Sequence, residues 1–333
     1  MEGDIAMFNR AIMTRRALVA GAFAIPAGLA AQAAWPNGTI TLIVPFPPGG
    51  QADLAGRPIA EALQRILKTT VIVDNRQGAG GAVGNAAVAK AAPDGQTLLM
   101  TLSSLAVLPE ASRLFDRPAL YEVDQLRPIA RVLADPTVLV VQASAPWQTV
   151  GDLVASAKAA PRTIPYGSSG TYGTLHVSME MFAAAAGIKL LHVAYRGAGP
   201  ALNDLLSGQV KALAAAPGTV KQHVDSGALR VLANFGAERV AAFPNVATFK
   251  ELGFADVELY IWAGLFVPSA TPEAIIVRLR DAMRQAMADP AVLRVFEAAG
   301  SPPAYQDADA FAAFIKTDNA RLVPAVGRIG KVE

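Results

Sequence analysis

The chain has 333 residues, of which 53% are hydrophobic and 17% are charged, so it can bury a sizeable core and is not of the disordered type. A net charge of +2, with no long run of lysine or arginine, excludes an electrostatic footprint for nucleic acid. The lack of cysteine excludes disulfides, thiol nucleophiles and thiolate metal sites, and the spacing of the three histidines fits no zinc motif. We therefore expect no metal, no cofactor and no nucleic-acid partner.

The N-terminal segment has the features of an export signal. Arg15 and Arg16 precede an apolar run over residues 17–31, and Ala31-Gln32-Ala33 is a small-x-small cleavage pattern. A membrane anchor is the alternative, but the run falls short of the roughly 20 apolar residues that span a bilayer. We expect residues 1–33 to be an upstream extension with a signal peptide cleaved near Ala33, which makes the mature protein periplasmic. The paired arginines suggest twin-arginine export, and general secretion stays open.

After this segment, short β-branched runs alternate with Ala-rich stretches of helical periodicity. The pattern predicts strands over 39–44, 71–73 and 97–100, with helices over 52–67 and 82–91. This β-α-β-α-β order is typical of a parallel, doubly wound sheet.

The alternation then restarts and predicts a second α/β unit. Its strands are expected over 138–141, 163–166, 190–194, 210–214 and 229–233, and its helices over 149–159, 174–185, 200–206 and 220–225. A long extended run over 257–267 returns the chain, and helices follow, one beginning at Thr271-Pro272-Glu273 and one over 307–322. We expect two α/β lobes joined by two crossing segments near 134–138 and 256–266. Lobe 1 would comprise 34–136 and 257–333, and lobe 2 would comprise 137–256.

The loops after the strands form the candidate ligand site, because open α/β sheets bind ligands at the carboxyl ends of their strands. The loop over 45–53 has stiffening prolines and two glycines, and it precedes a helix start whose free N–H groups suit an anion. Asp53 fits the usual acid of a helix start, and a ligand contact is the alternative.

The loop over 74–84 is rich in glycine and resembles a dinucleotide fingerprint. That motif should follow the first strand, and the next strand should end in an acid for the ribose. Here the strand over 97–100 leads into Thr101-Leu102-Ser103, with no acid. A nucleotide-dependent oxidoreductase therefore stays an alternative only.

In the second unit, the hydroxyl and N–H groups of the loop over 166–174 could surround an anion. A serine hydrolase is the alternative, but Gly167-Ser168-Ser169-Gly170 does not fit G-x-S-x-G, and spacing assigns no His/Asp partner. His176 and His192 are expected to be packing residues. Arg196 is a candidate carboxylate partner because its guanidinium fork matches two oxygens, and a surface ion pair is the alternative.

At these loops the sequence resembles the substrate-binding receptors of tripartite tricarboxylate transporters, also called the Bug family. The resemblance covers nearly the whole mature chain and lies in the segments 43–50, 74–81, 92–99, 166–170, 193–202 and 204–210. Gln51-Ala52 stands where Ser/Thr-Thr is common, Ala194 and Arg196 stand where Pro and Lys are usual, and 214–217 lacks polar residues often found there. These departures lie near the cleft and bear on which ligand is bound.

The resemblance implies a type II periplasmic binding-protein fold with a central cleft. It implies a carboxylate ligand, either a di- or tricarboxylate, an acidic amino acid or an aromatic acid, and delivery to permease subunits in the membrane. We expect a monomer that is not an enzyme, and an exported ligand sensor for a signalling partner is the alternative. The expected ligand-binding residues are Phe46, Pro47, Gly49, Gly50, Gln51, Asp53, Gly78, Ala79, Gly80, Thr101, Ser103, Ser168, Ser169, Gly170, Thr171, Tyr172, Thr174, Arg196, Gly197 and Pro217.

Overall fold

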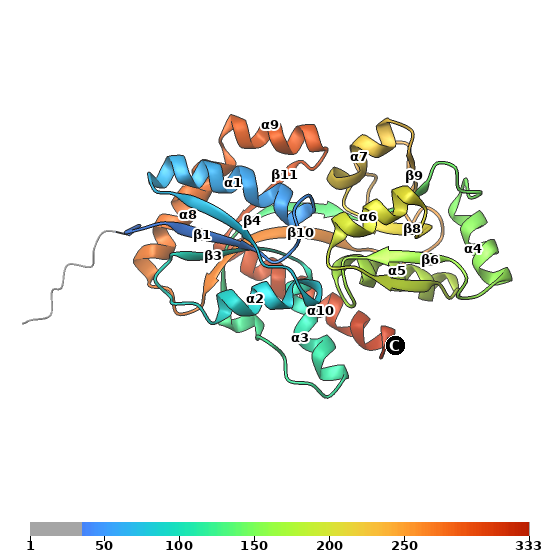
Figure 1. Cartoon of the computed structure of the whole chain (residues 1–333), viewed down its shortest axis with the longest axis horizontal. Coiled ribbons are helices and arrows are strands. Elements are labelled where there is room, and N and C mark those ends of the chain that lie inside the picture. Colours follow the sequence, from blue (N-terminus) through green and yellow to red (C-terminus); the bar gives the residue numbers. More distant parts are fainter. Residues whose placement is uncertain (1–34, 333) are drawn as a thin grey trace, which may run out of the picture. The chain divides into compact units, whose positions relative to one another are not determined.

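The computed structural model describes residues 35–332 and shows two mixed sheets, each with helices packed against it (Figure 1). The expected export signal, residues 1–33, lies outside the described residues. We call the six-stranded sheet with its helices lobe 1, and the five-stranded sheet with its helices lobe 2. The two α/β lobes confirm the predicted architecture. Within the described residues, no helix has both the length and the apolar character needed to cross a membrane.

Lobe 1 contains the first four strands of the chain and the last two. Its strands are β1 (Ile40–Val44), β2 (Val71–Asn75), β3 (Thr97–Leu102), β4 (Leu126–Pro136), β10 (Tyr260–Pro268) and β11 (Pro303–Asp307), in the spatial order β11-β4-β10-β3-β1-β2. Its helices are α1 (Gln51–Leu67), α2 (Ala82–Ala89), α3 (Ser104–Leu114), α8 (Glu273–Met287), α9 (Pro290–Ala299) and α10 (Ala308–Ile329), with 3-10 turns η1 (Ala79–Gly81) and η2 (Val123–Gln125).

The sheet of lobe 1 differs from the parallel sheet that the β-α-β-α-β order indicates. β1 pairs in parallel with β2 and β3, as predicted, but β10 is antiparallel to β3 and β4, and β11 is antiparallel to β4. The sheet is mixed because β10 enters it only after the chain has passed through lobe 2. Helix α3 and most of β4 were not predicted, because Pro109 in the helix and Pro128 in the strand belong to a residue type that usually interrupts such elements.

Lobe 2 contains the middle of the chain. Its strands are β5 (Val138–Gln142), β6 (Pro165–Ser168), β7 (Leu191–Ala194), β8 (Ala212–Ala215) and β9 (Leu229–Asn234), in the order β7-β6-β8-β5-β9. Its helices are α4 (Val150–Ala159), α5 (Thr174–Ala186), α6 (Ala198–Ser207) and α7 (Pro217–Asp225). Thr149 caps α4 as expected, since its side chain accepts the N–H of Asp152. α6 and α7 begin earlier than predicted, because glycine and proline in their first turns hide the apolar period.

The chain crosses between the lobes twice, as the predicted two-lobed fold implies, but most of the predicted second segment, 256–266, belongs to β10. The first crossing runs from β4 through Thr137 into β5, and the second runs over residues 235–259. The two crossings are bonded to each other, because Phe235 N donates to Thr137 O (2.8 Å) and Thr137 N donates to Leu259 O (3.2 Å). The exact domain limits stay a prediction.

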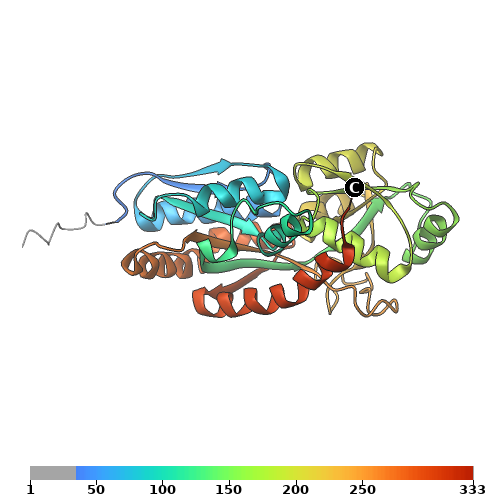
Figure 2. The same ribbon diagram turned by 90° about the horizontal axis from the view of Figure 1, so that it is seen from below.

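Helix α10 provides a third link between the lobes. It packs on α3 and β4 of lobe 1 and on α5 of lobe 2, and its last residues lie beside lobe 2 (Figure 2). Trp262 of β10 is fully buried, its ring lies 5.3 Å from that of Phe311, and its Nε1 donates to Asp318 (2.8 Å). Tyr172 and Val177 of lobe 2 belong to the same apolar cluster as Trp262, so the start of α5 is fixed to the core of lobe 1.

Candidate functional site

The strand-end loops of the two lobes contact each other directly. A Cβ atom on Gly197 would lie 2.3 Å from Cδ of Pro47, so only glycine fits beside the first loop. A Cβ on Gly170 would lie 3.1 Å from Cα of Gly80, and Gly170 also has a φ of +123°, which favours glycine. The loops that the sequence analysis selected in both lobes therefore meet at one place.

In the first loop, Asp53 is used for local structure. Burial opposes its ionisation, but hydrogen bonds from Arg57 Nε (2.9 Å), Gly49 N (3.0 Å) and Asn75 Nδ2 (3.2 Å) keep the pKa of Asp53 below its ordinary value. Both carboxylate oxygens are thus occupied. This geometry favours the helix-start role of Asp53 over a ligand contact.

The second loop presents backbone to lobe 2. Gly78 is half-buried, and Ala79 and Gly80 lie in η1 with positive φ values of 46° and 65°. The carbonyl of Gly80 accepts the hydroxyl of Ser104 (3.2 Å). The loop is therefore a tight turn that brings Gly80 against Gly170, with no side chain between them.

Two predicted hydroxyls follow β3 and have different partners. Thr101 Oγ1 donates to Asn85 Oδ1 (2.9 Å), so it ties β3 to α2 within lobe 1. Ser103 Oγ lies 2.8 Å from Thr174 Oγ1 and forms a buried hydrogen bond between the lobes. Ser103 and Thr174 thus lie together at the loop contact, and Thr101 does not reach it.

Ser168 forms a pair with a histidine that the sequence analysis did not assign to it. Ser168 Oγ lies 2.7 Å from His192 Nε2 and also accepts the N–H of Gly170 (3.2 Å). The rings of His176 and His192 lie 4.1 Å apart, and burial lowers the pKa of His176 to about 3 and of His192 to about 4. The contact between the two rings agrees with the packing role expected of both histidines.

A hydrolase would need a reachable serine and a competent base. The Ser168 side chain is fully buried, and among the described residues no carboxylate bonds to either histidine. Histidines with such low pKa values are also weak bases near neutral pH. The pair therefore orders the loop over 168–174 and lacks the arrangement of a catalytic triad.

The remaining predicted residues of lobe 2 are spread around this loop. Tyr172 is buried, donates its hydroxyl to Gly330 O (2.7 Å) and accepts the N–H of Val332 (3.0 Å), so it connects the loop to the end of α10. Arg196 is exposed and has no ion pair within the described part of the chain. Thr171 is half-buried beside Gly80, and Pro217 is the first residue of α7.

A small cavity of about 10 Å³ lies between the lobes at this contact, and we call it the interlobe cleft. Four of the predicted residues line it: Phe46, Gly50, Gln51 and Ser169. The sequence analysis missed its other lining residues, which are Ala52, Leu102, Leu175, Ala198, Ala216, Thr219 and Ile261. Most of these are apolar residues in strands or helices, and their side chains have no sequence signal that distinguishes a cleft wall from a core.

Gln51 and Asp135 form a buried polar pair at the cleft. Gln51 Nε2 donates to Asp135 Oδ2 (2.5 Å), and both side chains are only 2% exposed. Burial raises the pKa of Asp135 to about 7, although the Gln51 amide and the Ser301 hydroxyl oppose the shift. Gln51 Oε1 is buried and has no partner among the described residues, a state that costs about 1–3 kcal/mol.

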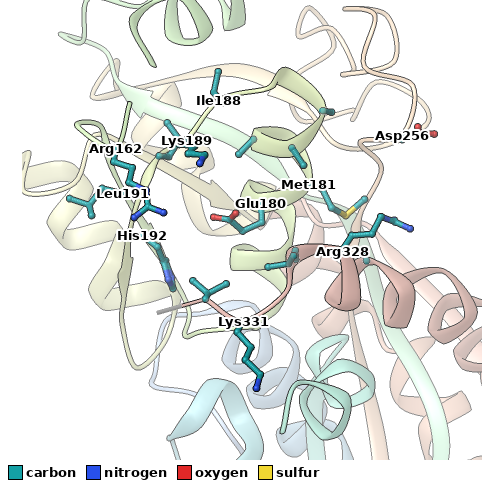
Figure 3. Close-up of a pocket in the computed structure, with 17 residues that line it drawn as sticks. Arg162, Glu180, Met181, Ile188, Lys189, Leu191, His192, Asp256, Arg328 and Lys331 are labelled. Carbon is teal, nitrogen blue, oxygen red and sulfur yellow. The ribbon is translucent and has the colours of Figure 1, made fainter. Parts of the chain in front are cut away.

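A second and much larger cavity, of about 770 Å³, lies between α5, β7 and the end of α10, and we call it the outer cavity. Figure 3 shows Arg162 and Lys189 on one side, Arg328 and Lys331 on the C-terminal segment, and Glu180 between them. All four of these cationic side chains are exposed. Lys331 lies 3.5 Å from Asp116, and Glu180 accepts a hydrogen bond from the hydroxyl of Tyr166.

The comparisons with known proteins agree with the resemblance found at the loops. The family model described as a tripartite tricarboxylate transporter family receptor matches residues 55–330. Protein BugT of Bordetella pertussis is 35% identical over 322 residues, which cover 96% of this chain and 98% of BugT.

Solved structures show the same fold. The periplasmic binding protein BugD matches with a TM-score of 0.83 at 27% identity, over 89% of this chain and 99% of BugD. The R. palustris protein Rpa4515, solved with adipate, also matches with a TM-score of 0.83 at 27% identity, over 89% of this chain and 98% of its own. The type II periplasmic binding-protein fold is therefore confirmed, and the chain belongs to the Bug family of tripartite tricarboxylate transporter receptors.

Proposed function

We propose that this protein is a periplasmic receptor that captures a small organic carboxylate in the interlobe cleft and delivers it to membrane subunits of a tripartite transporter. One observation carries the proposal. The helices α1, α5, α6 and α7 all begin near the cleft, and none of them has a side chain that caps its first turn. Side chains of Thr149, Asp289 and Asp307 cap α4, α9 and α10, which begin elsewhere, whereas α2, α3 and α8 also lack a side-chain cap. The gathering of four uncapped starts around one cleft is therefore what distinguishes this site.

Uncapped helix starts leave backbone N–H groups free and carry the positive end of the helix dipole. Several of them around one cleft make a site in which a carboxylate is held by neutral donors. Ser169 lines the same cleft and adds a side-chain hydroxyl donor, whereas the hydroxyl of Thr219 already donates to Ala216 O (2.8 Å). Exposed Arg196, next to the buried contact of Gly197, would attract the anion toward the entrance.

Entry of the ligand requires the lobes to separate. A cavity of about 10 Å³ has roughly the room of one water molecule, so a carboxylate can enter only after the walls of the cleft move apart. The two crossing segments allow the hinge motion that such two-lobed receptors use. The same loops would then close on the ligand, and the closed form would be the one presented to the membrane subunits.

The periplasmic location in this proposal is supported by the export pattern in residues 1–33 and by the family to which the chain belongs. The adipate in Rpa4515 supports a carboxylate as the ligand class.

The proposal is tested by a thermal-shift screen of residues 34–333 against mono-, di-, tri- and aromatic carboxylates, with their methyl esters as matched uncharged controls. A ligand present at 100 times its dissociation constant should add about 2.7 kcal/mol to the free energy of unfolding. We expect at least one acid, and not its ester, to raise the melting temperature. If no acid does so, and denaturing mass spectrometry finds no copurified acid, the proposal fails.

A further inference from the structure

Gln51 presents an unused hydrogen-bond acceptor at the interlobe cleft. Gln51 is one of the residues that line the cleft, its Nε2 donates to Asp135 Oδ2, and its buried Oε1 has no partner among the described residues. An ionised carboxylate can only accept hydrogen bonds, so above pH 7 the amide must direct its N–H toward Asp135. The carbonyl oxygen is then the atom that remains for the ligand.

Asp135 makes the surroundings of this acceptor negative. It is almost fully buried on β4, and among the described residues it forms no ion pair. No lysine, arginine or histidine is among the residues that line the cleft. A ligand group beside Gln51 therefore faces an amide oxygen with a carboxylate behind it, and no cation compensates either one.

The rest of the cleft wall is mainly apolar. Phe46, Leu102 and Ile261 come from lobe 1, and Leu175, Ala198 and Ala216 come from lobe 2. A second carboxylate would lose its hydration here without gaining a cation, and it would be repelled by Asp135. A hydroxyl or ammonium group would instead supply the hydrogen that Gln51 Oε1 lacks.

Building on the proposed function, we infer that the ligand is a monocarboxylate whose apolar body carries one hydrogen-bond donor, a hydroxyl or an ammonium group, and that Gln51 Oε1 binds this donor. The uncapped helix starts hold the carboxylate, and the pair of Gln51 and Asp135 selects against di- and tricarboxylates. This ligand class differs from the adipate bound by Rpa4515.

The test uses calorimetric titration of residues 34–333 at pH 8 with straight-chain acids of three to six carbons. Each length is supplied unsubstituted, with a hydroxyl or an amino group at position 2 or at the far end, and as the dicarboxylate. We expect a donor-bearing acid to bind at least about tenfold more tightly than both the unsubstituted acid and the dicarboxylate of its length. Tightest binding of a dicarboxylate would overturn this inference and leave the proposed function standing. Binding of none of these acids would overturn this inference, whereas the proposed function fails only if the wider thermal-shift screen is negative as well.

Two variants locate the selectivity. Gln51→Leu removes the acceptor at similar volume, so the ratio of the affinities for a donor-bearing acid and for the unsubstituted acid of its length should fall to about one. Asp135→Asn keeps a hydrogen-bonding partner for Gln51 and removes the charge, so it also provides a test if Gln51→Leu folds poorly. In Asp135→Asn, the affinity for an amino acid ligand should fall about tenfold, whereas that for a hydroxy acid should change little. The two donor classes are distinguished in this way.

Gln306→Leu is the matched control, because Gln306 Oε1 in β11 is also buried without a partner but does not line the cleft. Its order of ligand affinities should equal that of the parent protein. An unchanged preference for donor-bearing acids in both Gln51→Leu and Asp135→Asn would show that the pair does not contact the ligand.

Discussion

The interlobe cleft and the outer cavity differ in size, in charge and in the parts of the chain that form them. The cleft has a volume of about 10 Å³ and is formed by loops and helix starts from both lobes. The outer cavity has a volume of about 770 Å³ and is lined by residues of α5, β7, the end of α10 and nearby loops, which include the cations Arg162, Lys189, Arg328 and Lys331. By size and formal charge alone, the outer cavity would be the site of choice for an anion.

The contrast shows why neutral backbone can be the better anion site. The cations of the outer cavity are exposed, so solvent and salt screen their attraction for a carboxylate. The donors at the cleft are backbone N–H groups at helix starts, which are already oriented and need no cation. The cleft also lies where the two lobes meet, so binding there can be coupled to closure.

The two regions differ in the sign of their pH response. Burial raises the pKa of Asp135, beside the cleft, from 3.8 to about 7. Burial lowers the pKa of His192, which lines the outer cavity, from 6.5 to about 4. Between pH 4 and 6.5, Asp135 binds more protons in the folded protein than in the unfolded chain, so its contribution to the free energy of unfolding falls as pH rises. His192 binds fewer protons in the folded protein, so its contribution rises with pH.

The largest expected effect is that of Asp135→Asn on this pH dependence. The parent protein loses stability at Asp135 as pH rises from about 4 to 7, and the variant does not, because asparagine does not ionise. We expect the variant to gain up to roughly 4 kcal/mol relative to the parent between pH 4 and pH 8. Urea denaturation at both pH values measures this difference, in which the histidine contribution cancels. An equal difference at the two pH values would mean that Asp135 is ionised throughout.

Closure of the cleft is tested by Gly197→Ala. The new Cβ would lie 2.3 Å from Cδ of Pro47, so the two loops could not approach as they do here. Overpacking of about 1–3 kcal/mol would weaken ligand binding roughly 5- to 150-fold, while each lobe stays folded. Gly327→Ala is the matched control near the outer cavity, since no heavy atom of the described chain lies within 4 Å of its Cβ position. Equal affinity in the two variants would show that Pro47 and Gly197 do not meet in the bound state.

The sequence was sufficient for the two lobes and for the loops of the site, because both depend on local patterns. Runs of β-branched residues mark the strands, and glycines such as Gly80 and Gly170 mark the places where backbone approaches backbone. The family motifs lie in the same loops, so the resemblance and the periodicity support each other.

Pairs that depend on distant segments could not be predicted in this way. Gln51 and Asp135 are 84 residues apart, and neither has a neighbour in sequence that announces the other. The contact of Ser168 with His192 follows from the register of β6 on β7, in which Tyr166 pairs with His192 and Ser168 with Ala194. The antiparallel entry of β10 likewise follows from the path of the chain through lobe 2 and leaves no local signal.

Tyr172 lies between the two regions and tests whether they are coupled. Its hydroxyl bonds to Gly330 O and Val332 N, while its backbone belongs to the loop that contacts Gly80. Tyr172→Phe should lower the free energy of unfolding by about 1 kcal/mol, because water can replace the hydroxyl at these half-buried groups. Thermal unfolding without ligand measures the loss of stability, and the additional shift caused by ligand measures the change in affinity. A loss of affinity larger than the loss of stability would show that the end of α10 controls the cleft.

The smallest expected effect is that of removing cations from the outer cavity. Lys189 and Arg328 are exposed on its walls, and neither forms an ion pair within the described part of the chain. If the carboxylate binds in the cleft, the double variant Lys189→Ala and Arg328→Ala should keep its affinity within about twofold at physiological salt, since attraction over such distances is screened. At low salt its association rate should fall slightly, because the long-range field is weaker. A tenfold loss of affinity that grows as salt is lowered would move the ligand site to the outer cavity, and neutral helix starts would then not be what this receptor uses to hold its anion.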